Sequence, residues 1–286
     1  DKLRQKFYAS TATALCGMNG RYIEMDYQET QMYGDVMAMV KKQLNDFTLD
    51  VAIGGSINDR ITNSTRIDSK NASLKYANVF NLANIVMSSS ASIDQKIDAH
   101  YQLQSVFATA QIGYKEGVFL DLTARNDWSS TLAYTKYEKK GFFYPSVGVS
   151  FLPDKWVKMP EWVSFSKLRG AYSIVGNGVP PFITYPVSYV TAGGEILASD
   201  AAPFAEMKPE MTHSVELGME WKFLQHRLGL NLTYYRTDTY EQFFKLPALA
   251  GDKYAYRYVN AGDIRNQGWE ITLDATPVLT PDFTWK

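Results

Sequence analysis

The sequence predicts an all-β protein built from long antiparallel strands, and three observations support that prediction. Apolar and polar residues alternate along much of the chain, which is the two-residue period of a strand with one apolar and one polar face. Aromatic residues make up 14% of the 286 residues, and aromatic side chains favour strands over helices. The connections between the alternating runs are short and long in turn along the chain.

The alternating runs define the predicted strands, and a helix would instead need apolar spacings of three and four. Several runs reach about ten residues, which exceeds the roughly 5–6 residues of ordinary soluble strands. A tilted strand needs about 9–11 residues to cross a bilayer, so these runs are long enough for a membrane crossing. In chain order, the clearest runs cover residues 47–53, 118–125, 214–223, 228–235 and 268–274.

The connection lengths identify the kind of β-protein. An outer-membrane barrel has short turns on the periplasmic side and long loops on the extracellular side, whereas long loops within a compact soluble domain are uncommon. The sequence therefore predicts an antiparallel transmembrane β-barrel segment of about twelve strands with such turns and loops. The predicted short turns lie near residues 44–46, 115–117, 152–161, 224–226 and 276–282, and the long loops near 60–100, 127–141, 176–211 and 239–265.

The composition excludes several other classes of protein. The 29 basic and 30 acidic residues give a net charge of −1 without a basic run, so no nucleic-acid partner is expected. The single cysteine, Cys16, excludes an internal disulfide and a cysteine-based metal site. The mean hydropathy of −0.25 suits a barrel, because its apolar belt uses only every second residue. No secretory signal opens the chain and an alternating pattern restarts at its end, so a piece of a longer protein is expected.

Seven segments of the chain resemble, in order, the barrel of the SusC/RagA-type TonB-dependent outer-membrane transporters of Bacteroidetes. The resemblance covers nearly the whole chain and is loosest in the first 40 residues and in residues 179–211. Ala133 departs from the family pattern, which commonly has proline after Ser-Thr-Leu. The segments are FTLDVAIGGSIN, SVFATAQIGYKEGVFLDL, LTARNDWSSTLA, FFYPSVGVSFLP, FSKLRGAYSIVGN, THSVELGMEWKF and YVNAGDIRNQGWEITLDATPV.

The resemblance implies a larger protein in the Gram-negative outer membrane. Residues 1–286 would form part of one barrel of about 22 strands, without the plug domain, the TonB box and the C-terminal strands. Such a transporter would import oligosaccharides or peptides, with a SusD-like surface lipoprotein above the barrel and with TonB acting on the plug. Outer-membrane lipid would surround it, and no cofactor is implied.

Candidate substrate-binding residues come from one loop exit and from the polar faces of two strands. Asn126, Asp127 and Trp128 follow an alternating run, so they are expected either to shape a loop and an interfacial girdle or to contact the ligand. The polar-face candidates would line the lumen, and the competing role for them is packing against the plug or solvating the wall. They are Asp121, Arg125, Glu216 and Glu220.

Catalytic and metal-binding residues are not expected. His100, His213 and His226 have no metal-ligand spacing, no Gly-x-Ser-x-Gly motif is present, and no carboxylate pair is singled out. Two alternatives stay open at this point: a soluble all-β carbohydrate-binding module, and an outer-membrane barrel enzyme. The first would require no detergent for extraction, and the second would show a catalytic cluster on one rim.

Overall fold

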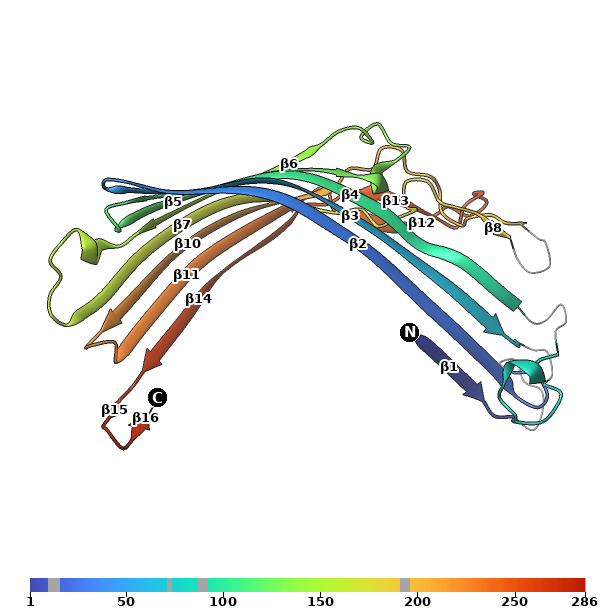
Figure 1. Ribbon diagram of the computed structural model, residues 1–286. Helices are drawn as coiled ribbons and strands as arrows, with labels where there is room; N and C mark the ends of the chain where they lie inside the picture. The colour runs from blue at the N-terminus through green and yellow to red at the C-terminus, as the bar shows by residue number, and fades with distance from the viewer. Residues whose placement is uncertain (10–15, 71–73, 87–91, 191–195, 286) are drawn as a thin grey trace.

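The computed structural model describes residues 1–9, 16–70, 74–86, 92–190 and 196–285. Its main element is a ten-stranded antiparallel sheet in which neighbouring strands follow chain order. Figure 1 shows this sheet as a long curved surface, with the short turns at its left end and the long connections toward its right end. The ten strands are β1 Lys2–Phe7, β2 Arg21–Leu44, β3 Phe47–Asp68, β4 Ser92–Tyr114, β5 Val118–Ser129, β6 Phe142–Phe151, β7 Val163–Asn177, β10 Glu210–Phe223, β11 Leu228–Tyr240 and β14 Ile264–Ala275.

Smaller elements lie in the connections and at the C-terminal end. The sequence indicated about twelve strands, whereas the main sheet has ten. Residues 241–263, which were predicted as a long loop, contain a separate two-stranded hairpin. The minor elements are η1 Leu82–Asn84, η2 Ser130–Leu132, η3 Pro153–Lys155, β8 Tyr189–Val190, β9 Ile196–Leu197, β12 Phe243–Pro247, β13 Tyr256–Asn260, β15 Val278–Leu279 and β16 Thr284–Trp285. Among the described residues, no helix is long and apolar enough to span a membrane.

The short turns lie where the sequence placed them, between β2 and β3, β4 and β5, β6 and β7, and β10 and β11. Tight hairpins that match the twist of their strands require left-handed backbone conformations. Asn45 at the first turn has φ 52°, and Lys115 and Glu116 at the second have φ 49° and 53°. The turn that follows β10 uses the same region at Gln225 and His226.

The long connections are shorter than predicted because the strands continue into them. β3 runs to Asp68 and β4 begins at Ser92, so the predicted loop 60–100 is reduced to residues 69–91. β5 likewise continues to Ser129, so residues 126–129 are strand and not the loop exit that was expected. The extra strand length is greatest in β2, β3 and β4, which have 24, 22 and 23 residues.

The strand register separates an apolar face from a polar face through the middle of the sheet. Directly paired residues of neighbouring strands project to the same side, so a row of partners can be followed from β3 to β14. One row on the apolar face consists of Leu49, Ile112, Leu120, Val149, Gly170, Leu217, Tyr234 and Trp269. The adjacent row on the polar face consists of Asp50, Gln111, Asp121, Gly148, Ala171, Glu216, Tyr235 and Gly268.

None of the described residues forms a second layer over the apolar face. Leu217 is 56% exposed and Ile271 is 70% exposed, although a soluble sheet would bury such residues beneath a second layer. The buried apolar clusters lie outside the sheet's centre, in the long connections. The larger cluster joins residues 130–141, 178–190, 196–209 and 241–263, which we term the loop cap. Its buried members are Leu132, Val179, Ile183 and Met207.

The ends of β2, β3 and β4 extend past the last residue of β5, because β5 pairs with β4 only from Leu103 onward. We term this extension the distal tip; it comprises residues 21–31, 60–68 and 92–102. β1 pairs with β2 there, and part of connection 69–91 folds back onto the tip. Tyr22, Leu74 and Ile85 form its small buried cluster.

Candidate functional site

A hydrogen-bonded group on the polar face contains two of the predicted site residues, Arg125 and Asp127. The Arg125 Nε donates to Asp127 Oδ1 at 2.7 Å, and its terminal nitrogen donates to Ser105 Oγ on β4 at 2.8 Å. Arg125 and Asp127 are two positions apart in one strand, so their side chains share a face. The charged group is therefore fixed in place on the polar face near the outer end of β5.

A second group on the polar face includes Glu216. Arg169 of β7 donates from Nε to Glu216 Oε1 at 3.2 Å, and from its terminal nitrogen to Thr233 Oγ1 of β11 at 2.7 Å. Gly218 lies opposite Arg169 in the register, and a Cβ at Gly218 would lie 2.5 Å from the Arg169 Nε. The glycine thus leaves the space through which the guanidinium reaches both partners.

Asp121 and Glu220 lie closer to the short turns. Gln111 Nε2 donates to Asp121 Oδ1 at 2.7 Å, and both residues line a polar hollow of 320 Å³ together with Ser150 and Lys167. Glu220 lies 3.3 Å from the Lys222 ammonium and opposite Lys167 in the register. Five of the seven predicted site residues therefore share the polar face: Asp121, Arg125, Asp127, Glu216 and Glu220.

Asn126 and Trp128 project from the opposite face of β5. They alternate with Asp127 in a continuous strand, so the three residues lie within β5 and not in the loop where the sequence placed them. Asn126 pairs with Phe143 of β6, and a Cβ at Gly141 would lie 2.9 Å from the Trp128 ring. Trp128 and Asn126 thus lie at the outer edge of the apolar face. This is where an aromatic residue of an interfacial girdle was expected.

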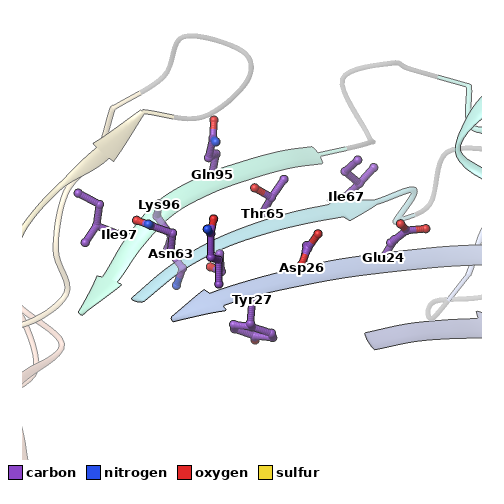
Figure 2. A pocket seen from close by; sticks show the side chains of 11 residues that line it. Glu24, Asp26, Tyr27, Asn63, Thr65, Ile67, Gln95, Lys96 and Ile97 are labelled. Atoms are coloured by element: carbon purple, nitrogen blue, oxygen red, sulfur yellow. The ribbon is translucent and has the colours of Figure 1, made fainter. Parts of the chain in front are cut away.

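A polar hollow of 910 Å³ on the distal tip was not predicted from the sequence. Figure 2 shows Glu24, Asp26, Thr65 and Gln95 projecting from one face of β2, β3 and β4, with Tyr27 on the other. The Tyr22 hydroxyl donates to Glu24 Oε2 at 2.6 Å, and this bond together with the charge of Arg4 lowers the pKa of Glu24. The remaining lining residues are Gln28, Asn63, Ser64, Ile67, Lys96 and Ile97.

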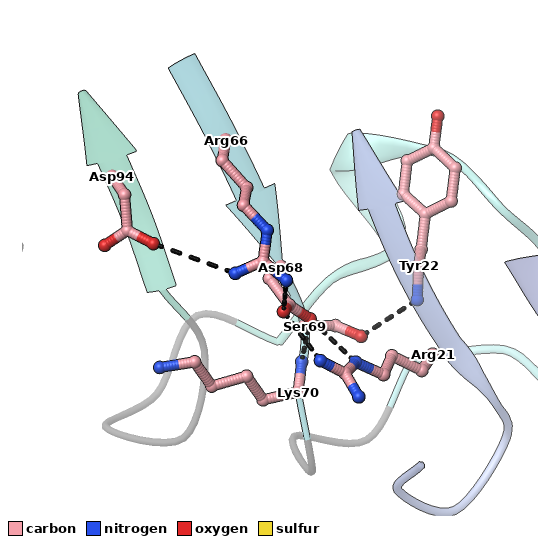
Figure 3. Close-up of polar contacts among 7 residues, drawn as sticks. All are labelled: Arg21, Tyr22, Arg66, Asp68, Ser69, Lys70 and Asp94. Carbon is pink, nitrogen blue, oxygen red and sulfur yellow. Dashed lines mark hydrogen bonds and ion pairs between the residues drawn. The ribbon is translucent and has the colours of Figure 1, made fainter. Parts of the chain in front are cut away.

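A buried ionic group fixes the outer end of β3. Asp68 has a side chain with 0% exposure and accepts two hydrogen bonds from Arg21, at 2.9 and 2.7 Å, and one from Arg66 at 2.5 Å. The Lys70 backbone N–H also donates to it at 2.8 Å (Figure 3). Burial of the carboxyl opposes ionisation, but the bonds from Arg21 and Lys70 and the neighbouring positive charges outweigh it and lower the pKa of Asp68.

The histidines lie apart from one another in the structure. His100 is 3.5 Å from Asp59, His213 shares a hydrogen bond with the Tyr172 hydroxyl, and His226 lies in the turn that follows β10. Within the described ranges, no group of three or more His, Cys, Asp or Glu side chains is arranged to hold a metal ion.

The uncovered apolar face, the polar face and the alternating short and long connections define the wall of a large antiparallel β-barrel, open at β1 and β14 in this chain. The chain belongs to the family described as TonB dependent receptor-like, beta-barrel, whose pattern matches residues 2–286. This match confirms the family resemblance seen in the sequence.

Individual relatives are longer proteins that share this barrel. A TonB-dependent receptor of Formosa agariphila is 27% identical over 198 residues, which are 65% of this chain and 19% of the relative. The TonB-dependent receptor SusC of Bacteroides thetaiotaomicron is 27% identical over 174 residues, covering 55% of this chain and 17% of SusC. The matched segments thus cover less than a fifth of the length of these curated relatives.

Among solved structures, the RagAB peptide transporter has a similar fold. It superposes with a TM-score of 0.81 at 19% identity, covering 99% of this chain and 32% of the transporter chain. At that identity the similarity establishes the fold of the barrel wall and not the cargo.

Proposed function

We propose that this chain forms part of the wall of an outer-membrane importer that takes up oligosaccharides or peptides with energy delivered through TonB. The observation that carries the proposal is the apolar face, whose residues are aligned by the strand register and exposed. A polar face lies on the other side of the same strands. In β10 the apolar positions run from Val215 to Phe223, close to the about 9–11 residues that a tilted strand needs to cross a bilayer.

The orientation of the wall follows from its two ends. The short turns would face the periplasm, and the loop cap and the distal tip would lie outside the cell. Aromatic residues gather at the turn end, where Phe47 contacts Tyr114 and Trp162 stacks on Phe223. Such rings suit the membrane–water interface because they are apolar with a polar edge or group.

The polar face would line the passage for the cargo. Arg125 with Asp127 and Arg169 with Glu216 offer fixed donors and acceptors, the groups that sugar hydroxyls and peptide amides bind. In the complete protein, a plug domain would occupy the lumen, and TonB would act on that plug. A SusD-like lipoprotein would cover the outer opening. The wall would carry out no covalent chemistry.

Cysteine labelling of intact cells tests the orientation. In a Cys16→Ala background, Leu249→Cys in the loop cap is expected to react with a membrane-impermeant maleimide, because Leu249 is 81% exposed there. Gln225→Cys in the turn after β10 is expected to react only after the cells are lysed. Labelling of position 225 but not of position 249 in intact cells would show that the orientation is reversed.

Single substitutions at Asp127 and Trp128 are expected to have different effects, because the two side chains project from opposite faces. Asp127→Ala removes an acceptor from Arg125, costs about 0.5–1.5 kcal/mol in stability and is expected to slow uptake of the cognate nutrient. Trp128→Ala is expected to leave the uptake rate near that of the wild type and to lower only the stability of the barrel in lipid. Uptake and urea-unfolding measurements on both variants check this, and equal uptake defects would contradict the separation of the faces.

A further inference from the structure

A charged group lies on the apolar side of the sheet, just beyond the end of the apolar rows. Arg236 and Asp238 of β11 and Arg265 of β14 form it, and the Asp238 carboxylate joins the two guanidinium groups. Arg236 Nε donates to Asp238 Oδ2 at 2.8 Å, and Arg265 Nε donates to Asp238 Oδ1 at 2.5 Å. Figure 1 shows the two strands that carry the group side by side in the sheet.

The strand register shows why these charges face the membrane side. Arg236 pairs with Val215, and Asp238 pairs with His213 and Arg265. Each of these residues lies two or four positions along its strand from a residue of the apolar row that contains Leu217, Tyr234 and Trp269. Their side chains therefore project to the same side as Leu217. Tyr172 and Tyr240 lie beside them and contact His213, with a Tyr172 hydroxyl to His213 Nδ1 distance of 2.8 Å.

Both guanidinium groups are arranged to accept a further anion. Each uses its Nε for Asp238, and no other hydrogen bond of either side chain is seen among the described residues. The Arg265 side chain is 54% exposed and that of Arg236 is 39% exposed, whereas Asp238 is 16% exposed. Two guanidinium groups and one carboxylate leave the group with a net positive charge. The terminal nitrogens of an arginine can donate two parallel hydrogen bonds to two oxygens of one phosphate.

An apolar hollow of 370 Å³ lies directly below this charged group on the same face. Leu217, Tyr234 and Trp269 form its upper row, two residues closer to the short turns than Val215, Arg236 and Gln267. Leu217 pairs with Gly170, and its side chain lies over that glycine, with Cδ2 3.3 Å from where a Cβ of residue 170 would stand. The other apolar lining residues are Leu168, Met219 and Leu232.

We propose that this surface is a binding site for a phosphorylated lipid of the outer leaflet. The phosphate lies against the terminal nitrogens of Arg236 and Arg265, and an acyl chain lies in the hollow below them. The inference rests on the proposed membrane location. A soluble phosphate compound fits the surface less well, because it would leave the apolar hollow uncovered while using only the guanidinium groups.

The test uses the full-length protein that contains this chain, purified in a neutral detergent. Mixed micelles carry either diphosphoryl lipid A or the same lipid without phosphate, and native mass spectrometry measures the bound lipid. The phosphorylated lipid is expected to bind at least about tenfold more tightly, which corresponds to about 1.4 kcal/mol. The Arg236→Gln and Arg265→Gln double variant is expected to lose that preference, since glutamine still donates to Asp238 but carries no charge.

Two controls separate a specific lipid site from a general attraction between the protein and anionic lipid. The Lys139→Gln and Lys158→Gln double variant removes two exposed charges elsewhere and is expected to keep the preference. Trp269→Ala is expected to weaken binding of both lipids, because it opens the apolar hollow. Inorganic phosphate that competes as well as the lipid does, or an arginine variant that keeps the preference, would overturn the proposal.

The same samples distinguish the lipid site from the proposed function. A heat-modifiable, folded barrel in lipid vesicles that shows no phosphate preference would overturn the lipid site and leave the importer proposal intact. A protein that stays folded in aqueous solution and does not enter vesicles would overturn both.

Discussion

Replacement of Asp68 by alanine is expected to unfold the distal tip while the rest of the sheet remains paired. The substitution leaves Arg21 and Arg66 without their shared carboxylate, which has no exposure in the wild-type chain. Removal of one partner from a buried ion pair costs about 3–5 kcal/mol. We expect a value of about 3 kcal/mol, because both guanidinium groups keep some contact with water.

Hydrogen–deuterium exchange resolves the two parts of the sheet. Amides of residues 21–26 and 64–70 are expected to lose protection in Asp68→Ala, and amides of β10 and β11 are expected to keep it. Asp94→Ala is the matched control, because Asp94 lies 4.0 Å from Arg66 and is partly exposed. Unchanged protection of the tip in Asp68→Ala, or an equal loss in the control, would show that Asp68 does not hold the tip.

Acid is expected to reproduce the effect of that substitution in the wild-type protein. The pKa of Asp68 in the folded state lies below its ordinary value of 3.8. A lowered pKa in the folded state stabilises the protein fully above the unfolded-state pKa, and this contribution is lost as the pH falls through the folded-state pKa. Protection of the tip should therefore be constant from neutral pH to about pH 5 and fall below about pH 3.8, and Asp68→Asn should remove this dependence.

Replacement of Leu217 by arginine is expected to destabilise the barrel strongly. Leu217 lies in the middle of the apolar positions of β10 and is 56% exposed on that face. A charged side chain on the lipid face of a barrel costs about 2–4 kcal/mol at the membrane midplane. Urea titrations of the full-length protein in lipid vesicles measure this cost directly.

Glu216→Ala provides the matched control on the polar face. Glu216 is half exposed and pairs with Arg169, and an exposed ion pair of this kind contributes about 0–1 kcal/mol. The control is therefore expected to unfold near the wild-type urea concentration. A neutral Leu217→Arg combined with a strongly destabilising Glu216→Ala would mean that the faces are assigned in reverse.

The structure also separates two regions at the same end of the sheet that the sequence treated alike as long loops. The loop cap has its own buried core, in which Thr184 Oγ1 donates to the carbonyl oxygens of Thr131 and Ala133. The distal tip is instead an extension of the sheet with a buried ionic group and a large polar hollow.

The sequence by itself determined the all-β class, the division of each strand into an apolar and a polar face, and the positions of the short turns. These features are local, because alternate residues of a strand project to opposite sides whatever strand lies beside it. The placement of Asp121, Arg125, Glu216 and Glu220 on the polar face follows from the same periodicity.

Only the tertiary structure decided which strands pair, how far they extend and which residues meet across them. Polar side chains occur on both faces of β2 from Gln28 to Gln31, so alternation could not reveal that β2 to β4 continue into the distal tip. The Asp68 group joins residues 47 positions apart, and Arg236 meets Arg265 only through the register of β11 with β14. Such contacts depend on long-range pairing, which a pattern within one strand does not specify.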